Sequence, residues 1–352
     1  MRTVVLSLAI AATAAALSTA TAAPKQSLRS LFTRGSDAVL VDPVEKVPLV
    51  SETTVIGGQV RSRYVAPSGA AYAVKQRYVD LLPSSGRAAP LSIDELQAEL
   101  LDAWESRTQT QLFRSPLTSF LYERGWRDGF KNAGFPGIEK EYEEAQAFFT
   151  PVAAGGVVVD MSCGSGLMTR RLLASGAYKR VLALDYSESM LLETARRVRG
   201  EAIPADTLTL CRADVAALPL APGSIDAMHA GAAMHCWPRL EEGLSQIRQS
   251  LKPGGRFFAT TFFQGAYGDA MPRQSGGASF RFFEDEEELT NLFLDAGFDG
   301  ATLSVRREGR GCAIIKAEAP AEAAAAPATA EAAGDEIVSD ACLDDDCGLP
   351  SD

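Results

Sequence analysis

The sequence predicts an α/β fold in which a mostly parallel sheet ends in an antiparallel hairpin. A β-branched run leads directly into a glycine-rich loop at residues 157–166, and strand-like and helix-like segments alternate from there to residue 296. Such alternation is typical of parallel sheets with helices on both faces. The connection between the last two strand-like runs, 301–307 and 312–317, is too short to join parallel strands, which predicts an antiparallel pair.

The expected elements of this unit follow one another in a regular order. Strands are predicted at residues 157–161, 180–185, 207–212, 225–230 and 256–262, and helices at 166–175, 188–199, 240–251 and 284–296. Lys252-Pro253-Gly254-Gly255 is expected to form the turn into the fifth strand.

Two smaller regions precede this unit. Strand-like runs on either side of a turn at Pro67-Ser68-Gly69 predict a hairpin within residues 58–82. Helical segments at 93–104, 117–126 and 139–149 are expected to form a cap. The predicted domains are a leader (1–36), a small β-hairpin segment (37–90), a helical cap (91–150), the sheet domain (151–318) and an acidic, Ala-rich tail (319–352) that cannot bury a core.

Composition narrows the classes of partner. The chain has 352 residues and a formal net charge of −11, which argues against nucleic acid as a partner because phosphate binding needs a basic face. Its six cysteines are scattered, which indicates reduced thiols rather than a disulfide framework. Cys342 and Cys347 are interpreted as idle thiols of a solvated tail. No Cys/His cluster has the spacing of zinc ligands, so no metal site is predicted.

The first 36 residues have the pattern of a targeting segment. A basic residue, a short Ala-rich apolar run and Ala20-Thr21-Ala22 together are typical of a signal peptide. Residues 23–36 are basic, contain serines and lack acids, which favours a two-part plastid-targeting leader. Plain secretion is the alternative.

The glycine loop after the first strand distinguishes between cofactors. Asp160-Met161-Ser162-Cys163-Gly164-Ser165-Gly166 lacks the third glycine of a dinucleotide loop, because Thr169 stands at that position. A carboxylate directly before the loop would repel a pyrophosphate but suits a cationic ligand. S-adenosylmethionine carries a sulfonium, an ammonium and no phosphate. The loop therefore predicts this cofactor, and the carboxylate of Asp160 is expected to pair with its ammonium group.

Further candidates stand at the carboxyl ends of the next strands, where ligands bind in open α/β sheets. Asp185 ends the second strand at the offset at which an acid meets a ribose, although it also suits a helix cap, with Ser187 as competitor. Asp214 follows the third strand and is placed to accept from the adenine amine, although such an acid is often only a surface residue. The predicted cofactor-binding set is Asp160, Ser162, Gly164, Ser165, Gly166, Asp185, Tyr186, Met190, Asp214, Val215 and Gly231.

Several runs together resemble a known family. These are Tyr122-Glu123-Arg124-Gly125-Trp126-Arg127, Gly134-Phe135-Pro136-Gly137, the glycine loop, Leu184-Asp185-Tyr186-Ser187-Glu188-Ser189-Met190 and His229-Ala230-Gly231-Ala232-Ala233-Met234-His235-Cys236-Trp237-Pro238. They resemble the chloroplast-targeted, plastoglobule-associated class I methyltransferases of plants and algae, which are related more distantly to quinone-biosynthesis C-methyltransferases. The resemblance covers residues 112–317 and implies a Rossmann-like class I methyltransferase sheet. It also implies a zinc-ribbon-like segment in plant members, whereas 58–82 has neither cysteine nor histidine and would be a degenerate ribbon.

The two histidines of the chain, His229 and His235, lie at or in the loop after the fourth strand. In the family that the chain resembles, this loop lies near the transferring methyl group. His235 is therefore the candidate catalytic residue, for acceptor positioning or proton removal, with a loop-structuring or cofactor-contacting role as the alternative. His229 is expected to be a satisfied core residue. Trp237 is expected to wall the acceptor, and Tyr122 and Trp126 to close over the cofactor.

These inferences predict an S-adenosylmethionine-dependent methyltransferase that acts on a small, lipophilic, quinone- or phenol-like acceptor and associates peripherally with plastid lipid droplets. A nicotinamide oxidoreductase is one alternative, disfavoured by Thr169, Asp160 and the terminal hairpin. A catalytically silent lipid-droplet protein that retains the fold is the other.

Overall fold

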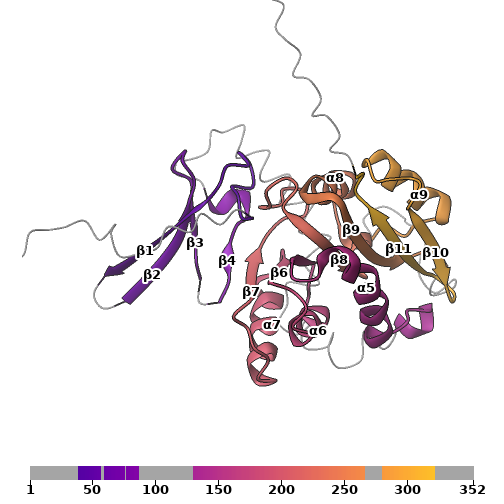
Figure 1. Cartoon of the computed structure of the whole chain (residues 1–352), viewed down its shortest axis with the longest axis horizontal. Coiled ribbons are helices and arrows are strands. Elements are labelled where there is room, and N and C mark those ends of the chain that lie inside the picture. The colour runs from indigo at the N-terminus through magenta and orange to yellow at the C-terminus, as the bar shows by residue number, and fades with distance from the viewer. Residues whose placement is uncertain (1–38, 57–58, 76, 87–129, 266–279, 322–352) are drawn as a thin grey trace, which may run out of the picture.

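The computed structural model describes residues 39–56, 59–75, 77–86, 130–265 and 280–321 (Figure 1). The predicted leader, the helical segments expected at 93–104 and 117–126, and the tail beyond residue 321 lie outside these residues. Tyr122 and Trp126 lie outside them as well.

An eight-stranded sheet organises the described part of the chain, in the order β10-β11-β9-β8-β5-β6-β7-β4 (Figure 1). Its strands are β4 (Val79–Asp80), β5 (Val157–Met161), β6 (Arg180–Asp185), β7 (Leu208–Arg212), β8 (Ile225–Gly231), β9 (Leu251–Phe262), β10 (Ser304–Glu308) and β11 (Cys312–Glu318). From β4 to β9 all neighbours in the sheet are parallel, whereas β11 is antiparallel to both β9 and β10. The predicted parallel sheet with an antiparallel terminal hairpin is confirmed.

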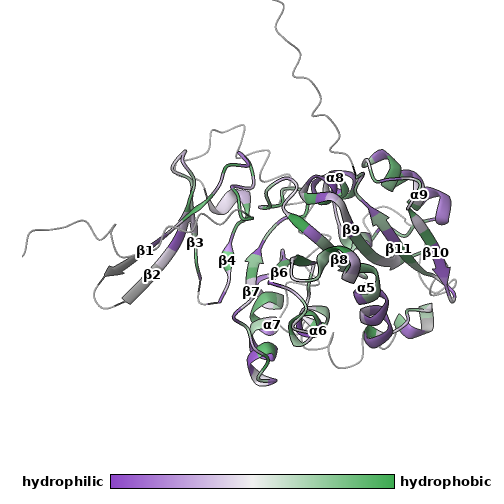
Figure 2. Ribbon diagram, in the orientation of Figure 1, coloured by the Kyte–Doolittle hydropathy of each residue, from purple (hydrophilic) through white to green (hydrophobic). Residues whose placement is uncertain are grey.

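Helices cover both faces of this sheet (Figure 1). They are α5 (Ile138–Ala153), α6 (Leu167–Ala174), α7 (Glu188–Gly200), α8 (Leu240–Ser250) and α9 (Glu286–Asp295). Residues of α8 and α9 join one buried apolar cluster and residues of α5, α6 and α7 another, so the sheet lies between two helical layers. Figure 2 shows hydrophobic colour along the central strands and hydrophilic colour towards the outside of the helices. No helix among the described residues is long and apolar enough to cross a bilayer.

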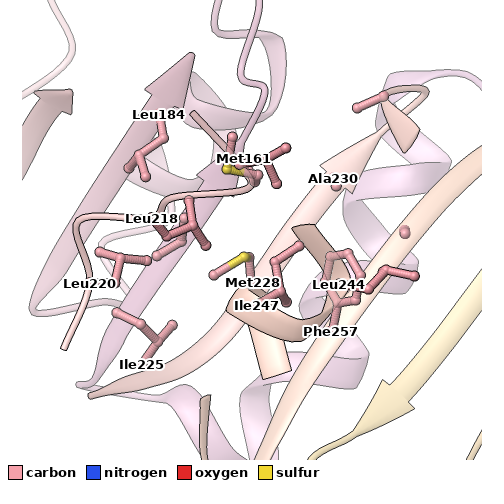
Figure 3. Packing of buried hydrophobic residues seen from close by; sticks show 14 of the residues in the cluster. Met161, Leu184, Leu218, Leu220, Ile225, Met228, Ala230, Leu244, Ile247 and Phe257 are labelled. Atoms are coloured by element: carbon pink, nitrogen blue, oxygen red, sulfur yellow. The ribbon is translucent and has the colours of Figure 1, made fainter. Parts of the chain in front are cut away.

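The core between the sheet and α8 fixes the strands whose ends form the site. Met228 of β8 and Phe257 of β9 are fully buried and pack with Leu244 and Ile247 of α8 (Figure 3). Each such side chain contributes roughly 1.5–3 kcal/mol when it leaves water. Close packing of this kind holds the strand ends in one arrangement.

The N-terminal region forms a three-stranded antiparallel sheet of β1 (Val50–Ile56), β2 (Gln59–Val65) and β3 (Ala71–Ala73). The expected turn joins β2 to β3, and Gly69 supplies the positive φ of 94° that this turn requires. β1 was not expected. The short strand β4 then joins the large sheet at the edge of β7, which the sequence did not indicate either.

The segment Lys252–Gly255 differs from its expected role as a turn before the fifth strand. It lies inside β9, between the pairs Ile225↔Leu251 and Ala227↔Arg256, so that Asp226 alone faces the extra residues. The Asp226 carboxylate accepts from Val157 N at 2.8 Å and from Lys252 Nζ at 2.6 Å. The four residues interrupt the pairing with β8 without ending β9.

The part of the cap that is described docks on the terminal hairpin. The helix expected at 139–149 is present as α5 and runs on to Ala153. Before it, Gly134 lies against the β10–β11 turn so closely that a Cβ there would be 2.4 Å from Glu308 O. This contact brings Phe130 and Phe135 against Phe262 at the end of β9, with ring centres 5.0 and 4.4 Å away.

Candidate functional site

A cavity opens beyond the carboxyl ends of β5, β6, β7 and β8 and comprises about 1010 Å³, including the open space at its mouth. The predicted site residues that line it are Ser162, Gly164, Asp185, Tyr186, Met190, Asp214, Val215, Gly231, His235 and Trp237. Asp160, Ser165 and Gly166 are not among the lining residues. The position agrees with the general rule that open α/β sheets bind ligands at these strand ends.

Asp185 holds the glycine loop in place. Its Oδ2 accepts from Gly164 N at 2.9 Å, and its Oδ1 accepts from Ser187 N at 2.8 Å. Burial raises the pKa of Asp185 to about 6, although the two backbone N–H groups and Arg212 favour the ionised form. Each carboxylate oxygen has a further lone pair, so Asp185 can still accept from a ligand.

The loop itself relies on glycine. Gly166 has a φ of 80°, and a Cβ there would lie 2.6 Å from Thr194 Cγ2 of α7. Thr194 Oγ1 in turn donates to Gly164 O at 2.8 Å. Gly166 therefore shapes the loop from outside the cavity, which explains why it does not line the wall.

Asp160 does not have the position expected for it. Its Oδ1 lies 3.0 Å from His229 Nδ1, and its Oδ2 accepts from Thr169 Oγ1 at 2.5 Å. The residue is 2% exposed. Both oxygens are thus engaged inside the protein and Asp160 lies behind the cavity wall, so its expected direct contact with a ligand ammonium stays a prediction.

The partner that completes this arrangement is Glu141 of α5, which the sequence reasoning missed. His229 Nε2 lies 3.0 Å from Glu141 Oε1, and Thr260 Oγ1 donates to the same oxygen at 3.3 Å. Burial lowers the pKa of His229, but its hydrogen bonds to Asp160 and Glu141 outweigh that effect and raise it to about 9. His229 is therefore an imidazolium at neutral pH and can donate from both ring nitrogens. It is a buried residue with both nitrogens hydrogen-bonded, as expected from the sequence.

Two further contacts tie the loops around the cavity together. Trp237 Nε1 donates to Ser162 Oγ at 3.0 Å, which links the loop after β8 to the loop after β5. Asp214 accepts from Ala216 N at 2.9 Å and from Arg239 Nη2 at 2.7 Å. Arg239 is the cavity's one basic lining residue in the described part of the chain, and this ion pair offsets its charge.

His235 sits in an aromatic environment at one side of the cavity. It belongs to the 3₁₀ turn Met234–Cys236, and its ring centre lies 4.7 Å from that of Phe262 and 5.4 Å from that of Phe280. Nε2 lies 3.2 Å from Cys236 Sγ, whereas Nδ1 is buried without a partner among the described residues. Desolvation by burial lowers the pKa of His235 to about 3, so the imidazole is neutral.

These geometric findings can be compared with known proteins. A family model described as a methyltransferase domain matches residues 158–255. Two uncharacterized chloroplastic methyltransferases of Arabidopsis thaliana are 48% and 52% identical, each over 44% of this chain and over 44% and 43% of the plant proteins. The chain thus spans less than half the length of these relatives in the matched stretch. A ubiquinone/menaquinone biosynthesis C-methyltransferase of Roseobacter denitrificans is 28% identical over 50% of this chain and 79% of that protein.

The solved structures that match this chain are more distant in sequence. Phosphoethanolamine N-methyltransferase 2 of Haemonchus contortus, in complex with S-adenosylhomocysteine, has a TM-score of 0.47 at 15% identity and covers 61% of this chain and 60% of its own. Geranyl diphosphate C-methyltransferase of Streptomyces coelicolor, also with S-adenosylhomocysteine, has a TM-score of 0.42 at 16% identity and covers 51% and 76%. The family match spans the strands and loops that build the cavity, from β5 into β9. Residues 158–255 of this α/β sheet therefore match a methyltransferase domain.

Proposed function

We propose that this protein is an S-adenosylmethionine-dependent methyltransferase that acts on a small, lipophilic, quinone- or phenol-like acceptor. The observation that carries the proposal is the placement of Asp185 at the end of β6, in the cavity wall, with its carboxylate held by the amide of Gly164. A carboxylate in this position can accept both hydroxyls of a ribose.

The charges around the cavity favour this cofactor over a dinucleotide. The lining includes the carboxylates of Asp185 and Asp214, and the guanidinium of Arg239 is paired with Asp214. Among the described residues, a pyrophosphate would meet two acids here, and the one guanidinium in the lining is already paired with Asp214. A nucleoside that carries a sulfonium and no phosphate fits the same wall.

The lining residues suggest how such a ligand would be held. Asp185 would accept from the ribose hydroxyls, Tyr186 and Met190 would wall the adenine, and Asp214 with Val215 would meet its far edge. The backbone at Gly164 and Gly231 would approach the methionine half. When bound, S-adenosylmethionine would supply a methyl group on a cationic sulfur; transfer would break that carbon–sulfur bond, form one to the acceptor, release the acceptor's proton to water and leave the thioether S-adenosylhomocysteine.

The acceptor side is apolar. Phe130, Ala232 and Trp237 line the cavity near His235, and Phe262 and Phe280 pack on the His235 ring. We propose that a planar, lipophilic ring binds there and that neutral His235 accepts a hydrogen bond from its hydroxyl. Positioning is the better role than proton removal, because a group with so low a pKa is a weak base. The similarity to quinone-biosynthesis C-methyltransferases supports a quinone-like acceptor.

We also propose that the protein works in the chloroplast. The chloroplastic names of the Arabidopsis relatives support this location, and the basic, acid-free segment 23–36 suits a two-part leader. Peripheral association with plastid lipid droplets would follow from a lipophilic acceptor. A fluorescent fusion to residues 1–36, imaged against chlorophyll and a lipid dye, tests the leader; export of the fusion from the cell would contradict it.

Calorimetric titration with S-adenosylmethionine, S-adenosylhomocysteine and NADH tests the cofactor. We expect both sulfur compounds to bind and NADH not to. Methyl-labelled S-adenosylmethionine incubated with the protein and a plastid lipid extract then tests the transfer, with label expected in the prenyl-quinone or phenol fraction. Binding of NADH alone would indicate an oxidoreductase, and tight cofactor binding without any labelled lipid would indicate a silent scaffold.

A further inference from the structure

The short strand β4 brings side chains from the N-terminal region against the wall of the cavity. β4 lies parallel to β7, and its last residue, Asp80, pairs directly with Arg212, the last residue of β7. Leu81 N donates to Arg212 O at 2.9 Å, which continues the pairing. The N-terminal region thus extends the sheet beside β7, one of the strands whose carboxyl ends border the cavity.

Arg212 connects this strand to a residue of the cavity wall. Its Nε donates to Tyr186 O at 3.0 Å, and its guanidinium lies 5.8 Å from the centre of the Tyr186 ring. Tyr186 lines the cavity, whereas Arg212 and Asp80 do not. The orientation of Arg212 therefore affects both the backbone and the ring of the residue that faces the ligand.

Asp80 fixes the orientation of Arg212 from the other side. Its Oδ2 lies 3.4 Å from Arg212 Nη1, and its Oδ1 accepts from Ser85 Oγ at 2.9 Å. Lys75 Nζ lies 2.7 Å from Oδ2. Burial raises the pKa of Asp80, but Lys75, Ser85 and Arg212 together keep it below its ordinary value, so Asp80 is a buried, ionised anchor.

A second contact from the same region reaches Glu188, two residues after Tyr186. Tyr78 donates its hydroxyl to Glu188 Oε1 at 2.6 Å, and Glu188 is the first residue of α7. The Tyr78 ring is buried and packs in the apolar cluster of Leu191 under α7. Asp80, acting through Arg212, and Tyr78 thus both hold the chain just after β6.

We propose that Asp80 and Tyr78 are positioning residues for the adenosine end of the methyl donor, so that the N-terminal region is an integral part of the cofactor site. The inference rests on the proposed function, because it assumes that an adenosine occupies the wall formed by Tyr186. Ligand binding costs less free energy when the side chains of the wall are already ordered. Asp80 and Tyr78 provide this order.

The test uses the full chain and two conservative variants, Asp80→Asn and Tyr78→Phe. Affinities for S-adenosylhomocysteine and for 5′-methylthioadenosine, which lacks the amino-acid half, are measured by calorimetry well below each melting temperature. We expect both ligands to bind about 3- to 10-fold more weakly, and by the same factor, because the lost order lies at the adenosine end. Glu52→Gln is the matched control, since it removes an exposed ion pair with Arg63 in the same region and is expected to change nothing.

Three results are decisive. Equal weakening of both ligands in either variant, with the control unchanged, supports the inference. Unchanged affinities in both variants, or a loss confined to S-adenosylhomocysteine, would overturn it while the proposed function stands. If the unaltered protein binds neither ligand, the proposed function itself fails, and the inference fails with it.

Discussion

His229 Nε2 lies 3.0 Å from Glu141 Oε1, and this contact joins the end of β8 to the cap helix α5 directly behind the cavity. The other ring nitrogen lies 3.0 Å from Asp160 Oδ1 at the end of β5. The imidazolium of His229 faces an acidic partner at each ring nitrogen, whereas loss of its proton would leave the two buried acids without a cation between them. The stability of the protein should therefore depend on the protonation of His229.

The first prediction concerns stability at alkaline pH. The pKa of His229 is raised from 6.5 to about 9 in the folded protein, so its contribution is fully present below about pH 6.5 and is lost as the pH rises through 9. The loss should amount to on the order of 3 kcal/mol of unfolding free energy. Urea denaturation from neutral to alkaline pH measures it. The His229→Gln variant should have a lower free energy of unfolding at neutral pH, and that free energy should change less between neutral and alkaline pH. If the variant and the unaltered protein lose stability with pH in parallel, His229 does not have this role.

Asp185 gives a second prediction, in a separate pH range. Its folded pKa is raised to about 6, and a ribose that donates to the carboxylate favours the ionised form. S-adenosylhomocysteine should therefore bind most tightly above pH 6 and progressively more weakly below it. Asp185→Asn should weaken binding by about 1–3 kcal/mol at neutral pH and remove the pH dependence in this range. Calorimetry checks both, and an unchanged affinity would exclude Asp185 as the ribose partner.

The third prediction separates acceptor positioning from cofactor binding. His235→Phe keeps the aromatic packing but removes the buried Nδ1, so methyl transfer should fall about 10- to 100-fold while the affinity for S-adenosylhomocysteine stays the same. His235→Asn retains an acceptor near the position of Nδ1 and should recover part of the rate. Labelled methyl transfer and calorimetry measure the two quantities. A parallel loss of affinity would instead indicate a cofactor-contacting role.

Most elements of the sheet domain could be predicted from the sequence, because the central strands are buried apolar runs and the helices are amphipathic. Ends differed by a few residues, as with α9, which begins at Glu286 rather than 284. The strand β4 could not be predicted, because two residues carry no periodicity and its pairing with β7 is made only in three dimensions. The continuation of β9 through residues 252–255 could not be predicted, because Lys252-Pro253-Gly254-Gly255 has the composition of an ordinary turn.

Most residues of the cavity wall could be predicted, because the ends of parallel strands meet at one edge of a sheet. The contact of Asp160 with His229 could not be predicted, because the two residues lie in strands far apart in the sequence. The burial of Glu141 could have been predicted from the pattern of α5. This residue shares the apolar stripe of α5 with Ala145, Phe149 and Ala153, and an acid on such a stripe needs a buried partner.

The last prediction concerns the glycine between this buried network and the cavity. Gly231 lines the cavity, and a Cβ on it would lie 2.5 Å from Glu141 Oε1 and 2.8 Å from His229 Cε1. Gly231→Ala should therefore push the network apart and cost about 1–3 kcal/mol of unfolding free energy, besides weakening the binding of S-adenosylhomocysteine. Gly200→Ala at the end of α7 meets nothing within 4 Å and is the matched control, expected to be neutral or slightly stabilising. Thermal unfolding with and without ligand measures both effects. Equal behaviour of the two variants would show that the network tolerates a methyl group and does not set the shape of the cavity.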